Sequence, residues 1–301
     1  MIYEARFIKD KEGLSLNRIL LDNAYGTTSV DLNEINQLRK LAQDFRWNQY
    51  YDLSEEIGKQ LFELLNGDSE TLSRAIKEAD DYNKTLQVIV MTEELTTNLP
   101  FELLYYDNFL VPSRRIHLTR QVSDRGIKSE PKPAARPLRI LFMVCSPSDI
   151  SPVLEFEKEE EAILEATKDL PVEIDVEDTG SLEGLGELLA TNEYDIIHLT
   201  GHADIDNNGK PFFWMEDEEG LGVKVKPQEL WEKLKLNLPR LIFLSGCRSG
   251  EVSGYFATIS FAHSLVLGHV SVALGWGLPV SNEAARFASE KLYFEPLFSN
   301  K

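Results

Sequence analysis

The first 124 residues combine two hydrophobic patterns. Apolar and polar residues alternate over residues 2–9 and 16–22, on either side of Lys11-Glu-Gly13, which predicts an antiparallel hairpin. Helical spacing of apolar residues follows in three segments, residues 32–46, 53–65 and 69–79. A strand is expected at residues 86–91, then a turn and a short strand at residues 99–104 and 109–111. This part of the chain is therefore predicted to be a smaller α+β region.

From residue 138 onwards, short apolar runs alternate with amphipathic stretches. The runs predict strands at residues 138–145, 172–177, 194–200, 240–244 and 270–275, and a hairpin at residues 212–215 and 222–225. The stretches between them predict helices at residues 155–169, 182–190, 227–235, 254–266 and 282–293. This alternation is typical of an α/β fold, a doubly wound and mostly parallel sheet with helices on both faces.

Residues 125–137 separate the two patterns. The segment carries three prolines in a polar run, and proline disfavours both helices and sheet ladders. We therefore expect three parts: an α+β region over residues 1–124, a linker over residues 125–137, and an α/β core over residues 138–301.

Composition narrows the classes of partner. The chain has 301 residues with a formal net charge of −19, which argues against direct contact with nucleic acid or an anionic membrane. Such acidity favours solubility and is compatible with a cationic protein partner. No apolar run reaches the ~18 residues of a membrane span, and the first residues lack the pattern of a signal peptide. With two cysteines in the chain, we expect a reducing, cytoplasmic setting.

Two segments of the predicted core, residues 194–202 and 241–250, share one design. Each is an apolar run that predicts a buried strand, and each ends at a small-residue turn that carries a reactive side chain, His202 or Cys247. If the strands are neighbours in a parallel sheet, ~5 Å apart, both side chains emerge at the carboxyl edge, where open α/β sheets bind ligands. A thiol and an imidazole within reach of each other make a nucleophile and its base.

The residues around Cys247 favour its thiolate form. The cysteine directly precedes a predicted helix, whose amide dipoles stabilise negative charge, and Arg248 adds a positive charge. Acyl transfer also needs donors for an oxyanion, and the backbone N–H groups of Cys247 and of Gly201 or Ala203 are the candidates.

Other polar residues have more ordinary interpretations. Asp149 lies beyond the first core strand, where it would favour a basic substrate side chain in a specificity pocket, or would be an ordinary loop or helix-start carboxylate. Asp204 and Asp206 are rival contributors to such a pocket. His198 is expected to be a core histidine bonded to the backbone, or a support for the His202 turn. The acidic run at residues 155–161 is expected to be a solvated first helical turn. No metal or cofactor is expected, because zinc spacings and phosphate-binding loops are absent from the sequence.

At these motifs the chain resembles the CHAT domain family, a caspase-like group of clan CD cysteine peptidases. The likeness lies in the histidine motif at residues 195–203 and the cysteine motif at residues 244–250. It extends to the segment around Trp276 and, upstream, to residues 53–65 and 98–104. The resemblance implies a cysteine endopeptidase in which His202 is the general base and Cys247 forms a thioester acyl-enzyme. Substrate-binding residues are then expected at Asp149, Asp204 and Trp276.

The resemblance also implies a setting. Such domains are usually joined to repeat, sensor or nucleotide-binding modules and linked to signalling, cell death or prokaryotic defence, so a regulatory module, fused or separate, is expected beside the protein substrate. Three positions depart from the pattern: Ala203 stands where glycine is usual, Asn282 where aspartate is common, and Ser245 where some relatives place an acidic S1 residue. Two other readings stay open. One is a catalytically silent caspase-like interaction module, and the other is a different hydrolase or an NAD-consuming α/β effector, for which the sequence shows no motif.

Overall fold

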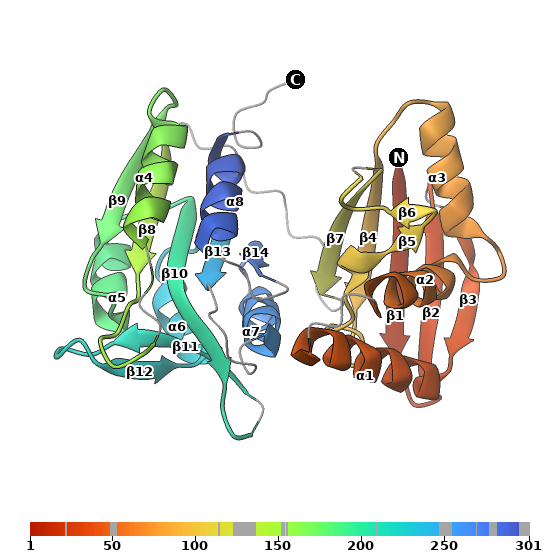
Figure 1. Ribbon diagram of the computed structural model, residues 1–301, viewed down its shortest axis with the longest axis horizontal. Coiled ribbons are helices and arrows are strands. Elements are labelled where there is room, and N and C mark those ends of the chain that lie inside the picture. The colour runs from red at the N-terminus through yellow and green to blue at the C-terminus, as the bar shows by residue number, and fades with distance from the viewer. Residues whose placement is uncertain are drawn as a thin grey trace. The chain divides into compact units, whose positions relative to one another are not determined.

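The computed structural model describes residues 1–21, 23–48, 53–113, 115–122, 137–151, 154, 156–208, 210–246, 255–268, 270–276 and 282–294. The chain divides into two compact units, Met1–Lys128 and Ser129–Lys301 (Figure 1). The predicted linker at residues 125–137 lies outside the described residues except for Pro137. No helix within the described part of the chain is long and apolar enough to cross a membrane.

The first unit is built on a five-stranded sheet in the order β3-β2-β1-β4-β7. The predicted hairpin is confirmed, because β1 and β2 pair antiparallel, while β3 and β7 were not predicted. Two small elements, the 3-10 helix Phe101–Leu103 and the hairpin β5–β6, occupy the predicted turn and short strand. The bounds are β1 Ile2–Lys9, β2 Leu14–Leu20, β3 Asn23–Val30, α1 Leu32–Asn48, α2 Leu53–Asn66, α3 Thr71–Asp81, β4 Leu86–Thr92, β5 Tyr105–Tyr106, β6 Asn108–Phe109 and β7 Ile116–Val122.

The second unit is an α/β domain with a seven-stranded, mostly parallel sheet. Five strands are parallel, in the order β9-β8-β10-β13-β14, and β11 and β12 extend β10 as an antiparallel hairpin. The bounds are β8 Leu138–Val144, α4 Phe156–Thr167, β9 Val172–Glu177, α5 Leu182–Thr191, β10 Ile196–Ile205, β11 Pro211–Glu216, β12 Gly222–Val225, α6 Pro227–Leu234, β13 Leu241–Gly246, α7 Tyr255–Leu267, β14 Val272–Gly275 and α8 Asn282–Phe294. The predicted fold class is thus confirmed.

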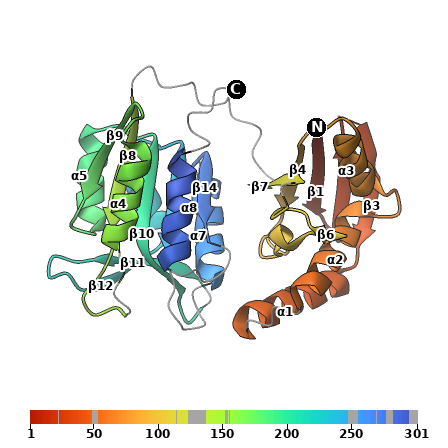
Figure 2. The same ribbon diagram turned by 45° about the horizontal axis from the view of Figure 1, so that its top comes forward.

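Helices cover both faces of this sheet (Figure 2). On one face, side chains of α5, α6 and α7 join the main core, for example Leu189, Leu230 and Phe261. On the other face, Ile163 of α4 and Tyr293 of α8 pack over Phe142. Chain order reverses direction between β8 and β10, and in such sheets ligands bind at the carboxyl ends of the strands beside that reversal. The topology therefore directs attention to the ends of β8, β10 and β13.

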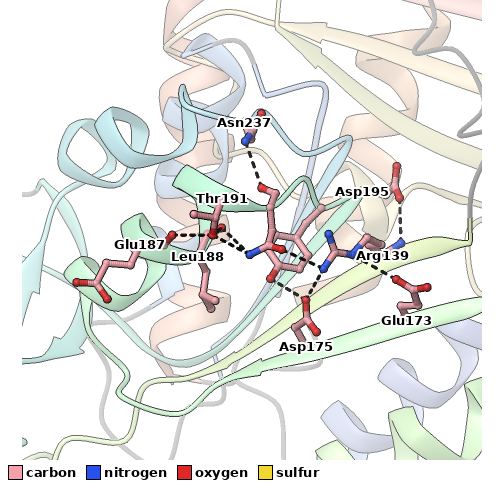
Figure 3. A network of polar contacts seen from close by, with 10 residues as sticks. Arg139, Glu173, Asp175, Glu187, Leu188, Thr191, Asp195 and Asn237 are labelled. Carbon is pink, nitrogen blue, oxygen red and sulfur yellow. Dashed lines mark hydrogen bonds and ion pairs between the residues drawn. The ribbon is translucent and has the colours of Figure 1, made fainter.

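The opposite, amino edge of the sheet is closed by a polar network (Figure 3). Arg139 of β8 forms a 2.7 Å ion pair with Asp175 of β9, and the Tyr194 hydroxyl donates to the same carboxylate at 2.8 Å. The backbone N–H of Arg139 donates to Asp195, which also lies 3.4 Å from Arg240. These contacts join the start of β8 to β9 and to the residues directly before β10 and β13, so this end of the sheet is a structural clamp.

Candidate functional site

Strands β10 and β13 bring the histidine and cysteine motifs side by side. The two strands are parallel neighbours, and their register pairs Thr200 with Ser245 and Gly201 with Gly246. His202 directly follows Gly201, and Cys247 directly follows Gly246. Cys247 itself lies outside the described residues. The register nonetheless places Gly201 and Gly246, which directly precede His202 and Cys247, at the same level of adjacent strands.

The turn predicted at His202 is wrong. β10 continues to Ile205, and from His202 onwards it pairs antiparallel with β11, with His202 opposite Trp214 and Ala203 opposite Phe213. The sequence pattern suggested an end because the small residues Gly201 and Ala203 interrupt the apolar run, but β11 supplies a partner that keeps the backbone extended. His202 is consequently 9% exposed and stands at the junction of the parallel and antiparallel parts of the sheet.

Gly201 is required by packing rather than by a turn. A Cβ atom at this position would lie 2.5 Å from Cε1 of Phe213, closer than such atoms approach in proteins, and would make a tight 3.1 Å contact with Cβ of Cys145. Gly201 and Ala203 both lie in paired strand, opposite Gly246 and Phe213. The roles of their N–H groups as oxyanion donors stay predictions.

A buried carboxylate lies on the α4–α8 side of the sheet. Glu159 of α4 is 5% exposed, and Oε1 accepts hydrogen bonds from the hydroxyls of Ser245 and Ser289, at 2.5 and 2.7 Å. Its Oε2 accepts from the Thr200 hydroxyl at 2.9 Å. One carboxylate therefore joins α4 to β10, β13 and α8.

His198 completes this cluster beneath the candidate site. Its ring is fully buried, with Nδ1 3.0 Å from the Tyr293 hydroxyl and Nε2 3.2 Å from Oε1 of Glu159. The second contact has the distance of an ion pair but not the direction of a hydrogen bond. Burial and the nearby charge of Glu159 raise the pKa of Tyr293, so its hydroxyl stays protonated and shares a hydrogen bond with Nδ1.

The environment keeps Glu159 ionised. Burial opposes the charged form, but the contact with His198 outweighs it, together with the hydroxyls of Ser245 and Ser289, and lowers the pKa of Glu159 to about 2. The expectation that this acidic run is a solvated helical turn is therefore wrong at Glu159. The expectation of a backbone partner for His198 is also wrong, because its described polar contacts are the side chains of Tyr293 and Glu159. Neither residue was placed in a common cluster from the sequence.

The three predicted substrate-binding residues lie on different elements. Asp149 is exposed in the loop after β8 and accepts a 2.7 Å hydrogen bond from the N–H of Gly222, which joins this loop to β12. Asp204 lies on the antiparallel part of β10, opposite Phe212. Trp276 directly follows β14 and packs edge-on against Phe243, with ring centroids 5.8 Å apart. Their contact with a substrate stays a prediction.

The second cysteine belongs to the core. Cys145 is fully buried beside Phe213, and burial is the main cause that raises the pKa of its thiol well above the ordinary value. A thiol in this state is a poor nucleophile. Among the described residues, no group of His, Cys, Asp and Glu is arranged to hold a metal ion.

A doubly wound sheet with a histidine strand beside a cysteine strand defines a module related to the caspase-like cysteine peptidases. The family comparison agrees with this class. The model of the CHAT domain family matches residues 55–295, and the chain belongs to that family. The match covers the first unit from α2 onwards and the second unit as far as residue 295. A comparison with curated proteins finds none that matches the chain.

Proposed function

We propose that this chain is a cysteine endopeptidase with His202 as general base and Cys247 as nucleophile. The observation that carries the proposal is the register of β10 and β13, which pairs the residues immediately before His202 and Cys247. A base must lie within hydrogen-bond reach of the nucleophile it activates, and side-by-side positions on strands ~5 Å apart are compatible with that reach, which supports the proposal.

The proposed reaction proceeds in two halves. His202 removes the thiol proton of Cys247, and the thiolate attacks the carbonyl carbon of the scissile peptide bond. The resulting oxyanion is stabilised by backbone N–H groups, for which Gly201, Ala203 and Cys247 are the candidates. The C–N bond then breaks as His202 returns the proton to the leaving amine, which leaves a thioester. Water, deprotonated by His202, hydrolyses the thioester and regenerates the thiol.

The wider role belongs to the same proposal. Membership of the CHAT family supports a regulated effector that acts on a protein substrate in signalling, cell death or prokaryotic defence. We propose a regulatory module, fused or separate, as its second partner. With a net charge of −19, the chain is not expected to contact nucleic acid or an anionic membrane directly, and the cytoplasm is the compartment we propose.

Mass spectrometry of casein and a mixed peptide library tests the activity. Wild type should release new peptides, whereas Cys247→Ala and His202→Ala should not. Cys145→Ala is the matched control, because the other cysteine is buried in the core, and this variant should retain cleavage. Cleavage that survives in Cys247→Ala would contradict the proposed nucleophile. Absence of cleavage by wild type and Cys145→Ala as well would favour the alternative, a catalytically silent interaction module.

A further inference from the structure

The buried Glu159 cluster lies on the two strands that carry the candidate site. Thr200 and Ser245 face each other in the β10–β13 register, and each donates its hydroxyl hydrogen to Glu159. The Thr200 hydroxyl also lies 3.2 Å from the carbonyl oxygen of Ser245. A single carboxylate thus bridges both strands at one level of the sheet.

That level is two residues before His202 on β10 and, in the sequence, two residues before Cys247. Side chains alternate between the faces of a strand, so residues two apart share a face. His202 follows Thr200 by two positions within one continuous strand, and Cys247 follows Ser245 by two positions in the sequence. The alternation of side chains therefore places His202 on the same face of β10 as Thr200 and its partner Glu159. Thr200 and His202 are roughly 7 Å apart along the strand, at 3.3 Å per residue.

Side chains of β10 and α8 make further contacts with the cluster. His198 occupies the next position of that face, two residues before Thr200, and contacts Glu159 through Nε2 at 3.2 Å. On α8, Ser289 contacts the same carboxylate oxygen as Ser245, and Tyr293 contacts His198. Hydrogen bonds to an ionised acceptor are stronger than those between neutral groups. The ionised carboxylate therefore fixes the two hydroxyls, and with them the spacing of β10 and β13.

We propose that Glu159 is a positioning residue of the peptidase site, which sets the relative placement of His202 and Cys247 by bridging Thr200 and Ser245. This inference rests on the proposed dyad and extends it to a residue that does not touch the reacting atoms. Its consequence is that the imidazole activates the thiol well only while Glu159 is charged and both hydroxyls are present.

The pH dependence of thiol alkylation tests the inference without a known substrate. Full-length protein is treated with iodoacetamide over a pH series, and the peptide that contains Cys247 is followed by mass spectrometry. An activating histidine lowers the midpoint below the ordinary value of about 8.5 for a free cysteine. Wild type should show a lowered midpoint, and His202→Ala should lose it.

Glu159→Gln should move the midpoint toward that of His202→Ala and slow alkylation at pH 6.5 about tenfold, as a midpoint one pH unit higher requires. Glu161→Gln is the matched control, because it makes the same chemical change at an exposed position of the same helix, and its midpoint should equal that of wild type. Thr200→Val and Ser245→Ala each remove one half of the bridge and should shift the midpoint in the same direction. These two variants decide the question if Glu159→Gln does not fold.

Ser289→Ala separates positioning from stability. It removes a hydrogen bond to the same oxygen of Glu159 from α8, so it should lower stability as much as Ser245→Ala with a smaller shift of the midpoint. Equal shifts of the midpoint in Ser289→Ala and Ser245→Ala would overturn the inference. An unchanged midpoint in Glu159→Gln would overturn it too. If Glu159→Gln does not fold, unchanged midpoints in both Thr200→Val and Ser245→Ala have the same consequence. A wild-type midpoint equal to that of His202→Ala would instead refute the dyad itself, and the positioning role with it.

Discussion

Replacement of Glu159 by glutamine should destabilise the second unit by about 3 kcal/mol at pH 7. The carboxylate is buried and accepts three hydroxyl hydrogen bonds, and glutamine preserves its shape but not its charge. A fall of the pKa from 4.5 to about 2 corresponds to about 3 kcal/mol at 1.36 kcal/mol per pH unit. Removal of one member of a buried ion pair, as in this substitution beside His198, has a similar cost, roughly 3–5 kcal/mol.

The pH dependence has a definite sign. The folded-state pKa of Glu159 lies below the unfolded value, so the stabilisation is fully present above about pH 4.5 and is lost as the pH falls toward about 2. The free-energy difference between wild type and Glu159→Gln should therefore be constant from pH 7 to about 5 and then shrink. Only well below pH 2 is the carboxyl of folded wild type fully protonated and equivalent in charge to the amide.

Urea unfolding followed by tryptophan fluorescence measures this difference, because Trp214, Trp231 and Trp276 all lie in the second unit. Glu161→Gln, an exposed change on the same helix, should stay within about 0.5 kcal/mol of wild type. A difference below about 1 kcal/mol for Glu159→Gln at pH 7 would refute the reasoning. So would a difference that does not decline between about pH 4.5 and pH 2.

Three further changes test other parts of the account. Gly201→Ala should cost about 1–3 kcal/mol in urea unfolding, because its Cβ would meet Phe213, and a second change, Phe213→Leu, should recover part of the loss. Arg139→Met removes the ion pair with Asp175 at the amino end of the sheet and should lower the free energy of unfolding by about 1–2 kcal/mol. The alkylation rate of Cys247 should not change, and a slower rate would show that this network also affects the candidate site. Asp149→Asn keeps the acceptor for the Gly222 N–H but removes the charge. Cleavage after Lys and Arg should therefore fall about tenfold relative to cleavage after apolar residues. An unchanged ratio in the peptide library would exclude Asp149 from substrate selection.

The sequence predicted the elements of the second unit well, because each strand and helix there has its own strong hydrophobic pattern. That β10 and β13 are neighbours was only assumed from the sequence. Their register could not be predicted, because the local hydrophobic pattern of each strand carries no information about its partner. The error at His202 has the same origin. Nothing in residues 200–205 shows that β11 returns to pair with them, and this distant partner keeps the strand extended.

The buried cluster was missed for a different reason. A run of glutamates at the start of a helix is usually solvated, and the run at residues 155–161 gives no internal sign that Glu159 differs from its neighbours. Only the packing of α4 against α8 and the sheet gives it partners from three other elements. One signal was present: Ser245 and Thr200 are small polar residues at the ends of otherwise apolar strands, where hydroxyls need a buried acceptor.

Covalent trapping of Cys247 tests the central claim most directly. Wild type, His202→Ala and Cys145→Ala are incubated at pH 7 with a set of peptidyl chloromethyl ketones that differ at P1, and the adduct is located by mass spectrometry. The account predicts one adduct, on Cys247, that forms with at least one P1 residue in wild type and Cys145→Ala and at least tenfold more slowly in His202→Ala. An equal rate in wild type and His202→Ala, or no adduct on Cys247 with any peptide, would contradict the claim that His202 and Cys247 form a peptidase dyad.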